Sequence, residues 1–220
     1  MQFNLYFVLK TNIIHLCTVN GENNYEFHVY AKNLPTDLRH RQQHFEALDV
    51  LSEVCAEVYG IRHLQLRRDE HGKPQLIHPF LHMNLAHCKG LVVCAVGTVP
   101  LGVDAEPPRS AKQSIISRIC AENELIQLEK SDAPAFLFSR FWTLKEAYGK
   151  YDGGGIRLPL ETLDFSLSDD SICFRHPNAD EVSFFQILLS LQDGSDLSVS
   201  VCTSRLIQPV IQSDFHVLTS

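Results

Sequence analysis

Two carboxylates in the segment "GVDAE" (102–106) have a spacing that could serve chemistry on a metal ion or a phosphate. If this segment is a strand, Asp104 and Glu106 point to the face opposite Val103, about 7 Å apart at the backbone. Two like charges on one face repel each other unless a positive charge lies between them. The pattern is compatible with a solvated acidic edge, which is its commoner meaning, and with a cation site.

A third carboxylate lies in "FWTLKEAYGKYDGGGI" (141–156), between two lysines. On a helix, Trp142, Glu146 and Lys150 fall on one face, at i, i+4 and i+8. An ordinary surface ion pair at i,i+4 contributes only about 0.3–0.5 kcal/mol. Because a tryptophan shares the face of this pair, the segment equally indicates a carboxylate that is held for chemistry.

Cationic and imidazole side chains supply candidates for phosphate binding. Lys73 lies in "EHGKPQL", in a turn that follows Arg67 and Arg68, and His87 lies in "NLAHCKG", just ahead of an apolar run. Lysine binds phosphate as a compact point charge. A solvated hairpin tip and a hydrogen-bonded structural histidine are the alternatives for these two positions.

Other catalytic signatures do not occur. The sequence contains no GxxxxGK[ST], GxSxG or HExxH motif. "HPFLH" (78–82) has HxxxH spacing, but Pro79 disfavours the helix that such a zinc site requires. The glycines at 153–155 follow a helical pattern, so they indicate a helix stop and not a dinucleotide fingerprint.

The elements that must position these residues can be read from hydrophobic periodicity. Residues 2–30 alternate like strands, and 37–60 predict a helix that ends at Gly60, with Phe45, Leu48 and Leu51 on its core face. The segment 63–79 predicts a hairpin around Gly72. The remaining elements are listed by range: strands at 91–96 and 100–108, helices within 110–151 with Ser131 as the N-cap of the last, and strands after the glycines with a hairpin turn at "QDGSD".

Composition narrows the class of protein. The chain has 220 residues, 45% of them hydrophobic, and a net charge of −7, which argues against a general binder of nucleic acids or membrane surfaces. The seven cysteines form no CxxC pair and are interpreted as free thiols of a reducing compartment. The N-terminal stretch lacks the features of a signal peptide, and no apolar run approaches the ~20 residues that span a bilayer. We therefore expect a cytoplasmic protein.

The order of elements suggests two similar α+β lobes, because each half carries a main helix with strands after it. We place the boundary after the acidic strand, which gives an N-terminal lobe of residues 1–106 and a C-terminal lobe of residues 107–220. The fold class predicted is thus α+β, a pseudo-dimer with its site in the cleft between the lobes.

Four patterns in one order now carry a resemblance: "GKPQL", "NLAH", "GVDAE" and "WTLKEAYGK". Together they resemble the phosphopantetheinyl transferases, specifically the surfactin-type, two-lobed branch. That family pairs GxDxE with WxxKExxxK some 35 to 40 residues later. Gly102, Asp104 and Glu106 match the first motif. The second is matched by Trp142, Lys145, Glu146 and Lys150.

The resemblance implies a function and a site. The family moves the phosphopantetheine arm of coenzyme A onto a serine of an apo acyl or peptidyl carrier protein, with Mg²⁺ held at the positions of Asp104, Glu106 and Glu146. The position of Glu146 is also the candidate base. Coenzyme A phosphates are met at the positions of Lys150, Lys73 and His87, with Arg68 aligned more loosely. A monomer is expected, since a pseudo-dimer supplies both halves of the cleft. Glu146 would then stand between two lysines because it must lie beside an anionic substrate.

Two departures from the family pattern keep an alternative open. Ala86 stands where the family has serine before the histidine, and Ala121 stands at the N-cap of a helix where serine or threonine is usual. The alternatives to an active transferase are a catalytically weak, carrier-binding paralogue of the same fold and another Mg²⁺-dependent enzyme acting on a nucleotide diphosphate.

Overall fold

The structure is a computed structural model that describes residues 7–8, 13–20, 25–69, 72–168, 171–190, 196–204, 210–211 and 217–219. Its contacts divide the chain into two compact units. Unit 1 comprises the described residues up to Leu101 together with strand β13 (Val210–Ile211). Unit 2 begins at Gly102 and includes strand β14 (Val217–Thr219).

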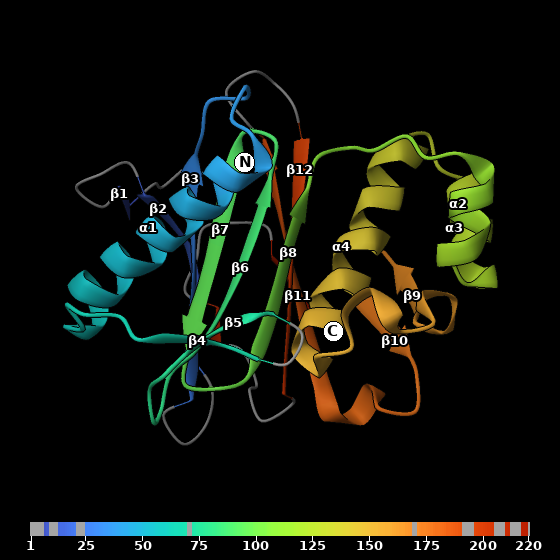
Figure 1. The fold of residues 1–220 in the computed structure, drawn as a ribbon. Coiled ribbons are helices and arrows are strands. Elements are labelled where there is room, and N and C mark those ends of the chain that lie inside the picture. The colour runs from blue at the N-terminus through green and yellow to red at the C-terminus, as the bar shows by residue number, and fades with distance from the viewer. Residues whose placement is uncertain are drawn as a thin grey trace. The chain divides into compact units, whose positions relative to one another are not determined.

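Unit 1 is an antiparallel sheet with one long helix (Figure 1). The sheet order is β1-β2-β3-β7-β6, and β13 pairs with β2. The bounds are β1 Phe7–Val8, β2 Ile13–Asn20, β3 Glu26–Asn33, α1 His40–Tyr59, β6 His82–Cys88 and β7 Leu91–Gly97. A separate hairpin joins β4 (Leu66–Arg68) to β5 (Pro74–Leu76).

Helix α1 packs on this sheet through a stripe that includes Val50, Leu51 and Val54, each of which is buried. Gly60 ends the helix in the left-handed conformation (φ 69°), as the sequence predicted. The prediction that Phe45 faces the core is wrong. This side chain is 52% exposed, and the guanidinium of Arg41 lies 5.7 Å from the centre of its ring.

Unit 2 contains the acidic strand and the glycine-terminated helix. Its main sheet has the order β14-β11-β12-β8, and β9 pairs with β10 in a second sheet. The bounds are β8 Leu101–Glu106, α2 Gln113–Ile119, α3 Glu122–Glu129, α4 Pro134–Asp152, η2 Gly155–Arg157, η3 Leu160–Thr162, β9 Asp164–Leu167, β10 Ile172–Arg175, η4 Ala179–Glu181, β11 Val182–Ser190 and β12 Asp196–Ser204. Strands β11 and β12 form the predicted hairpin, but its turn lies outside the described residues.

Helix α4 is the centre of unit 2 and packs against β12 (Figure 1). Phe141 and Leu144 of α4 are fully buried in a cluster with Phe165 and Phe184. The helix ends at Gly153 (φ 90°), which confirms the predicted glycine stop. Its start corrects a prediction, because the N-cap residue is Ala133 and not Ser131, whose hydroxyl accepts a hydrogen bond from the Ala133 N–H.

The predicted mixture of helices and strands is confirmed. The equivalence of the two lobes and their division after residue 106 stay predictions. Among the helices within the described ranges, none is both long enough and apolar enough to span a membrane.

Candidate active site

Strand β8 presents the two carboxylates of the first motif as the sequence predicted. Val103 and Ala105 are buried, and Asp104 and Glu106, which alternate with them, are partly exposed. Glycine is required at Gly102 because the backbone of α4 passes directly over it. A Cβ at that position would collide with the carbonyl oxygen of Ala147 and the backbone nitrogen of Tyr151.

This close approach brings Glu146 and Lys150 of α4 to the acidic face of β8. The Lys150 ammonium lies 2.8 Å from Asp104 Oδ1 and also donates to the carbonyl oxygen of Val103, at 2.8 Å. The side chains of Lys150 and Asp104 are 26% and 13% exposed. The ion pair of this lysine is thus made with β8, across 46 positions of sequence, and not simply along the helix.

The three carboxylates influence one another's protonation. Burial, followed by the charge of Asp104, raises the pKa of Glu106 to about 7, and Glu146 adds to the rise while Arg109 and Lys150 oppose it. Burial and the charge of Asp104 likewise raise the pKa of Glu146, against Lys150. Glu106 and Glu146 therefore ionise less readily than free carboxyls, because burial and the charge of Asp104 both disfavour a further negative charge on this face.

The donor set suits a hard divalent cation. Asp104 Oδ2 and Glu146 Oε1 are buried and have no hydrogen-bond partner among the described residues, which is costly unless another group satisfies them. Among the residues that the structure describes, no group of three or more acidic, histidine or cysteine side chains is arranged closely enough to hold a metal ion. Carboxylate oxygens with raised pKa values and unused lone pairs are nevertheless the ligands that Mg²⁺ prefers, so the residues present fit this ion.

Lys145, the other lysine of the motif, corrects the expectation that Glu146 is flanked by two site lysines. Its ammonium is fully buried and lies 2.8 Å from Glu124 Oε2, whose side chain is also fully buried. Lys145 therefore belongs to the interior of unit 2. Glu124 also caps the start of α3, because its Oε2 accepts the N–H of the N-cap residue Ala121 at 2.9 Å.

Arg109 was not identified from the sequence as a residue of this face, nor was its contact with the ring of Trp142. The Arg109 guanidinium carbon lies 5.6 Å from the centre of the Trp142 ring, a cation–π contact. Its position three residues after Glu106 was the one available signal. Arg109 is exposed and is one of the two cations that lower the pKa of Glu106.

The remaining predicted residues lie in unit 1, on two separate elements. Arg68 ends β4 and is exposed, and its guanidinium donates to the carbonyl oxygen of Gly72 at 2.7 Å. Lys73 follows Gly72 in the turn and is partly buried, and its backbone N–H donates to Asp69 Oδ1 at 2.9 Å. Strand β5 of this hairpin lies next to β6.

His87 stands on β6 and faces the start of α1. Its ring centre lies 4.5 Å from that of His40 and 6.3 Å from that of His44, so three imidazoles gather there. Ala86 is buried and alternates with His87 along the strand, so the two point to opposite faces of the sheet. The roles of Arg68, Lys73 and His87 in phosphate binding stay predictions.

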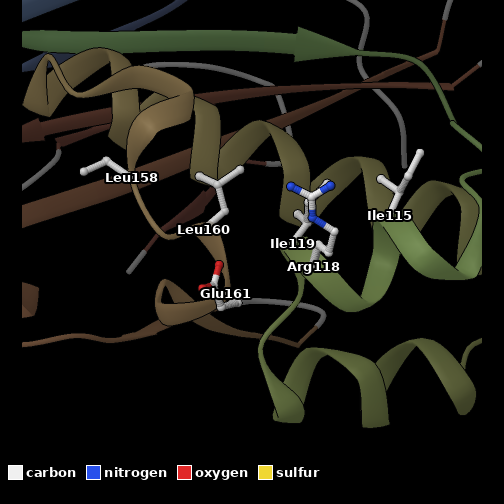
Figure 2. A pocket seen from close by; sticks show the side chains of 6 residues that line it. All are labelled: Ile115, Arg118, Ile119, Leu158, Leu160 and Glu161. Carbon is white, nitrogen blue, oxygen red and sulfur yellow. The ribbon is translucent and has the colours of Figure 1, made fainter.

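A pocket of about 300 Å³ lies elsewhere in unit 2, between α2 and the segment after α4 (Figure 2). It is lined by Ile115, Arg118, Ile119, Leu158, Leu160 and Glu161. None of the three carboxylates lines it. The pocket is therefore separate from the acidic face of β8 and α4.

Comparison with known proteins agrees with the motifs. Residues 100–202 match the model of the 4′-phosphopantetheinyl transferase superfamily. The chain is 28% identical over 162 residues to a 4′-phosphopantetheinyl transferase of Bacillus subtilis, covering 71% of each chain. It is 29% identical over 110 residues to 4′-phosphopantetheinyl transferase Sfp of Bacillus subtilis strain 168, covering 49% of each. A third relative, 4′-phosphopantetheinyl transferase HetI of Nostoc, is 32% identical over 140 residues, covering 59% of each.

The chain is therefore similar to 4′-phosphopantetheinyl transferases, a class of enzymes, and the family model matches it over residues 100–202. The matched regions span from about half to 71% of these relatives' own length. The similarity to Sfp and its Bacillus counterparts confirms the predicted resemblance to the surfactin-type branch.

Proposed function

We propose that the protein transfers the 4′-phosphopantetheine arm of coenzyme A onto a serine of an apo acyl or peptidyl carrier protein. The serine oxygen forms a bond to the phosphorus that carries the pantetheine. The bond from that phosphorus to the adenosine 5′-phosphate oxygen breaks, and adenosine 3′,5′-bisphosphate leaves. The single observation that supports this function best is the acidic face of β8 and α4, with its buried, unpartnered oxygens at Asp104 and Glu146.

We assign the binding of Mg²⁺ to Asp104, Glu106 and Glu146, whose donor chemistry fits it. When bound, the ion offsets negative charge on the diphosphate and the leaving group during transfer. The chain's own residues then have separate tasks. Glu146 accepts the proton of the attacking serine, and its raised pKa brings it closer to the operating range of a general base. The Lys150 ammonium supplies positive charge for a phosphate oxygen beside the same face.

We assign the remaining coenzyme A phosphate contacts to Lys73 and His87 of unit 1, and to Arg68 next to them. This assignment requires the two units to act as lobes on either side of one cleft, as in the proposed pseudo-dimer. A protein built this way needs no second copy to complete the cleft, so we propose that it is a monomer. We also propose that it is cytoplasmic. Size-exclusion chromatography with light scattering tests that proposal, and a mass twice that of the chain would contradict it.

Intact-mass spectrometry of a carrier protein tests the function. An apo acyl or peptidyl carrier protein is incubated with the chain, coenzyme A and Mg²⁺, and a gain of one phosphopantetheine on serine is expected. Complex formation without a mass gain would instead indicate the weak, carrier-binding paralogue. Turnover of coenzyme A without any carrier would indicate a different Mg²⁺-dependent enzyme.

A further inference from the structure

A fully buried ion pair lies beneath the active helix. The Lys145 ammonium lies 2.8 Å from Glu124 Oε2, and both side chains are completely inaccessible to solvent. The same ammonium donates to the carbonyl oxygens of Ile119, Leu160 and Leu163, at 2.8, 2.7 and 2.7 Å. The three N–H groups of a lysine ammonium match the three carbonyl oxygens in number, and Glu124 supplies the opposite charge at ion-pair distance.

Both oxygens of the Glu124 carboxylate also accept hydrogen bonds from the backbone. Glu124 Oε2 accepts the N–H of Ala121 and Oε1 accepts the N–H of Phe165, each at 2.9 Å. A buried ion pair is tolerated when its remaining hydrogen-bonding capacity is satisfied in this way. Such pairs rarely add stability over an apolar core, and their best-attested benefit is that they specify one arrangement.

The partners of Lys145 come from segments that are separate in the sequence. Ile119 ends α2, Leu160 begins η3, and Leu163 follows η3, while Glu124 connects to the starts of α3 and β9. All of them converge on one side of α4. Helix α4 therefore cannot rotate about its axis without breaking several hydrogen bonds at a single ammonium.

Rotation of α4 matters because Glu146 is the next residue along the helix. Successive helical residues are offset by about 100° around the axis, so the orientation of Lys145 fixes the direction in which Glu146 points. Ile119 and Leu160, whose carbonyl oxygens accept hydrogen bonds from this ammonium, are also two of the residues that line the pocket in Figure 2.

We propose that Lys145 and Glu124 are positioning residues, which set the rotation of α4 and thereby hold Glu146 against the carboxylates of β8. The inference rests on the proposed function, because it assigns the pair a task in metal binding and transfer. It predicts an effect on the site that is separable from the effect on stability.

The experiment compares Lys145→Met with the double variant Lys145→Met/Glu124→Leu. The single variant leaves a carboxylate buried without its cation, so its melting temperature should fall. The double variant removes both charges and should regain part of the melting temperature, although the N–H groups of Ala121 and Phe165 lose their acceptor. The three carbonyl oxygens still lack their donor, however, so α4 is no longer fixed in rotation. We expect kcat of the folded double variant to stay at least tenfold below that of the wild type, with KM for coenzyme A changed less than threefold.

The affinity for Mn²⁺, measured by electron paramagnetic resonance, is the second readout and does not depend on turnover. We expect it to be weakened at least threefold in the double variant. Ile172→Ala is the matched control, because it removes a buried side chain of the unit 2 core cluster that has no hydrogen-bonding group to offer Lys145 or Glu124. It should lower the melting temperature and leave kcat and the Mn²⁺ affinity unchanged.

Recovery of kcat and Mn²⁺ affinity together with stability in the double variant would overturn the proposal and leave the pair a purely structural role. A wild-type chain that modifies no carrier protein would contradict the proposed function instead. The positioning role would then be judged on Mn²⁺ affinity alone, where a wild-type value in the double variant would overturn it.

Discussion

Helix α4 carries two lysines, five residues apart, that each form an ion pair with a carboxylate of another element. The two pairs have the same length but differ in burial and in the hydrogen bonds of the carboxylate. The ammonium-to-carboxylate distance is 2.8 Å in both. The Lys145–Glu124 pair is fully buried, whereas Lys150 and Asp104 are 26% and 13% exposed. The partner of Lys145 uses both of its oxygens within the protein. The partner of Lys150 keeps Oδ2 buried and without a partner among the described residues.

The two ion pairs have the same length, so distance does not distinguish them. They differ in whether the carboxylate oxygens have all found partners within the protein: those of Glu124 have, and Oδ2 of Asp104, at the proposed active site, has not. Glu124 is fully buried and both of its oxygens accept hydrogen bonds within the protein, so a ligand cannot reach it. Asp104 shares its face with Glu106 and Glu146, and the buried oxygens Asp104 Oδ2 and Glu146 Oε1 have no hydrogen-bond partner among the described residues, so this face retains unused capacity for a ligand. The first pair should therefore govern stability and the geometry of α4, and the second should govern binding and chemistry.

The largest effect should come from Asp104→Ala. This variant removes the carboxylate that faces both neighbouring acids and the ammonium of Lys150, so transfer at ordinary Mg²⁺ concentrations should be abolished. Partial recovery is expected at high Mg²⁺ or with Mn²⁺. The assay is mass gain of the carrier protein across a metal titration, and full activity at low Mg²⁺ would contradict the assignment of the metal site.

Glu124→Ala should mainly lower the stability of the folded protein, whereas Asp104→Ala should mainly lower its activity. It leaves the Lys145 charge buried and unpaired, and breaking such a pair costs about 3–5 kcal/mol of the free energy of unfolding. Urea denaturation measures this loss, with Asp104→Ala as the comparison, for which we expect a much smaller change. If Asp104→Ala proved the more destabilising of the two, the division between the pairs would be wrong.

Lys150→Ala should act on phosphate handling. A hydrogen bond to a charged group contributes about 1.5–3 kcal/mol, so KM for coenzyme A should rise about tenfold to a hundredfold. The Mg²⁺ concentration that gives half-maximal rate should stay nearly unchanged, since Lys150 is not a metal ligand. Steady-state kinetics with each component varied in turn separate the two effects, and a shift confined to Mg²⁺ would contradict this role.

A smaller effect is expected from pH. The pKa of Glu106 lies at about 7 in the folded, metal-free protein, above its ordinary value of 4.5. Its protonated form stabilises the folded state below the unfolded pKa, and that contribution is lost as pH rises through about 7. Mg²⁺ requires the deprotonated form. Its apparent affinity should therefore weaken by at most about tenfold per pH unit below 7, and Glu106→Gln should flatten this dependence in calorimetric titrations.

Much of the acidic face could be predicted from sequence because it follows from short-range periodicity. Alternation along a strand placed Asp104 and Glu106 together, and the helical repeat with its glycine stop placed Glu146 and Lys150 on α4. Each of these inferences needs only the geometry of one element. The family resemblance then joined the two elements.

The partners of the two lysines could not be read this way, because both are reached across long sequence separations. The i,i+4 rule pairs Lys150 with Glu146, whereas the structure pairs it with Asp104 across 46 positions. One signal for Lys145 was present. At helical spacing it shares a face with Phe138, Phe141 and Tyr148, all buried, and a charge on an apolar face predicts a buried partner. The prediction for Phe45 was wrong for a different reason. Helical spacing alone does not give the width of the apolar face, and Phe45 lies outside the part that is buried.

The most direct test of the account is the rate of the chemical step in Glu146→Gln. This change keeps the size of the side chain and one oxygen ligand but removes the charge and the base. In a single-turnover reaction with saturating coenzyme A, carrier protein and Mg²⁺, followed by quench and intact-mass analysis, the account predicts transfer at least ~10²-fold slower than in the wild type, with carrier binding preserved. Transfer at most of the wild-type rate would contradict it, and Glu146 would then be an ordinary carboxylate on the surface of α4.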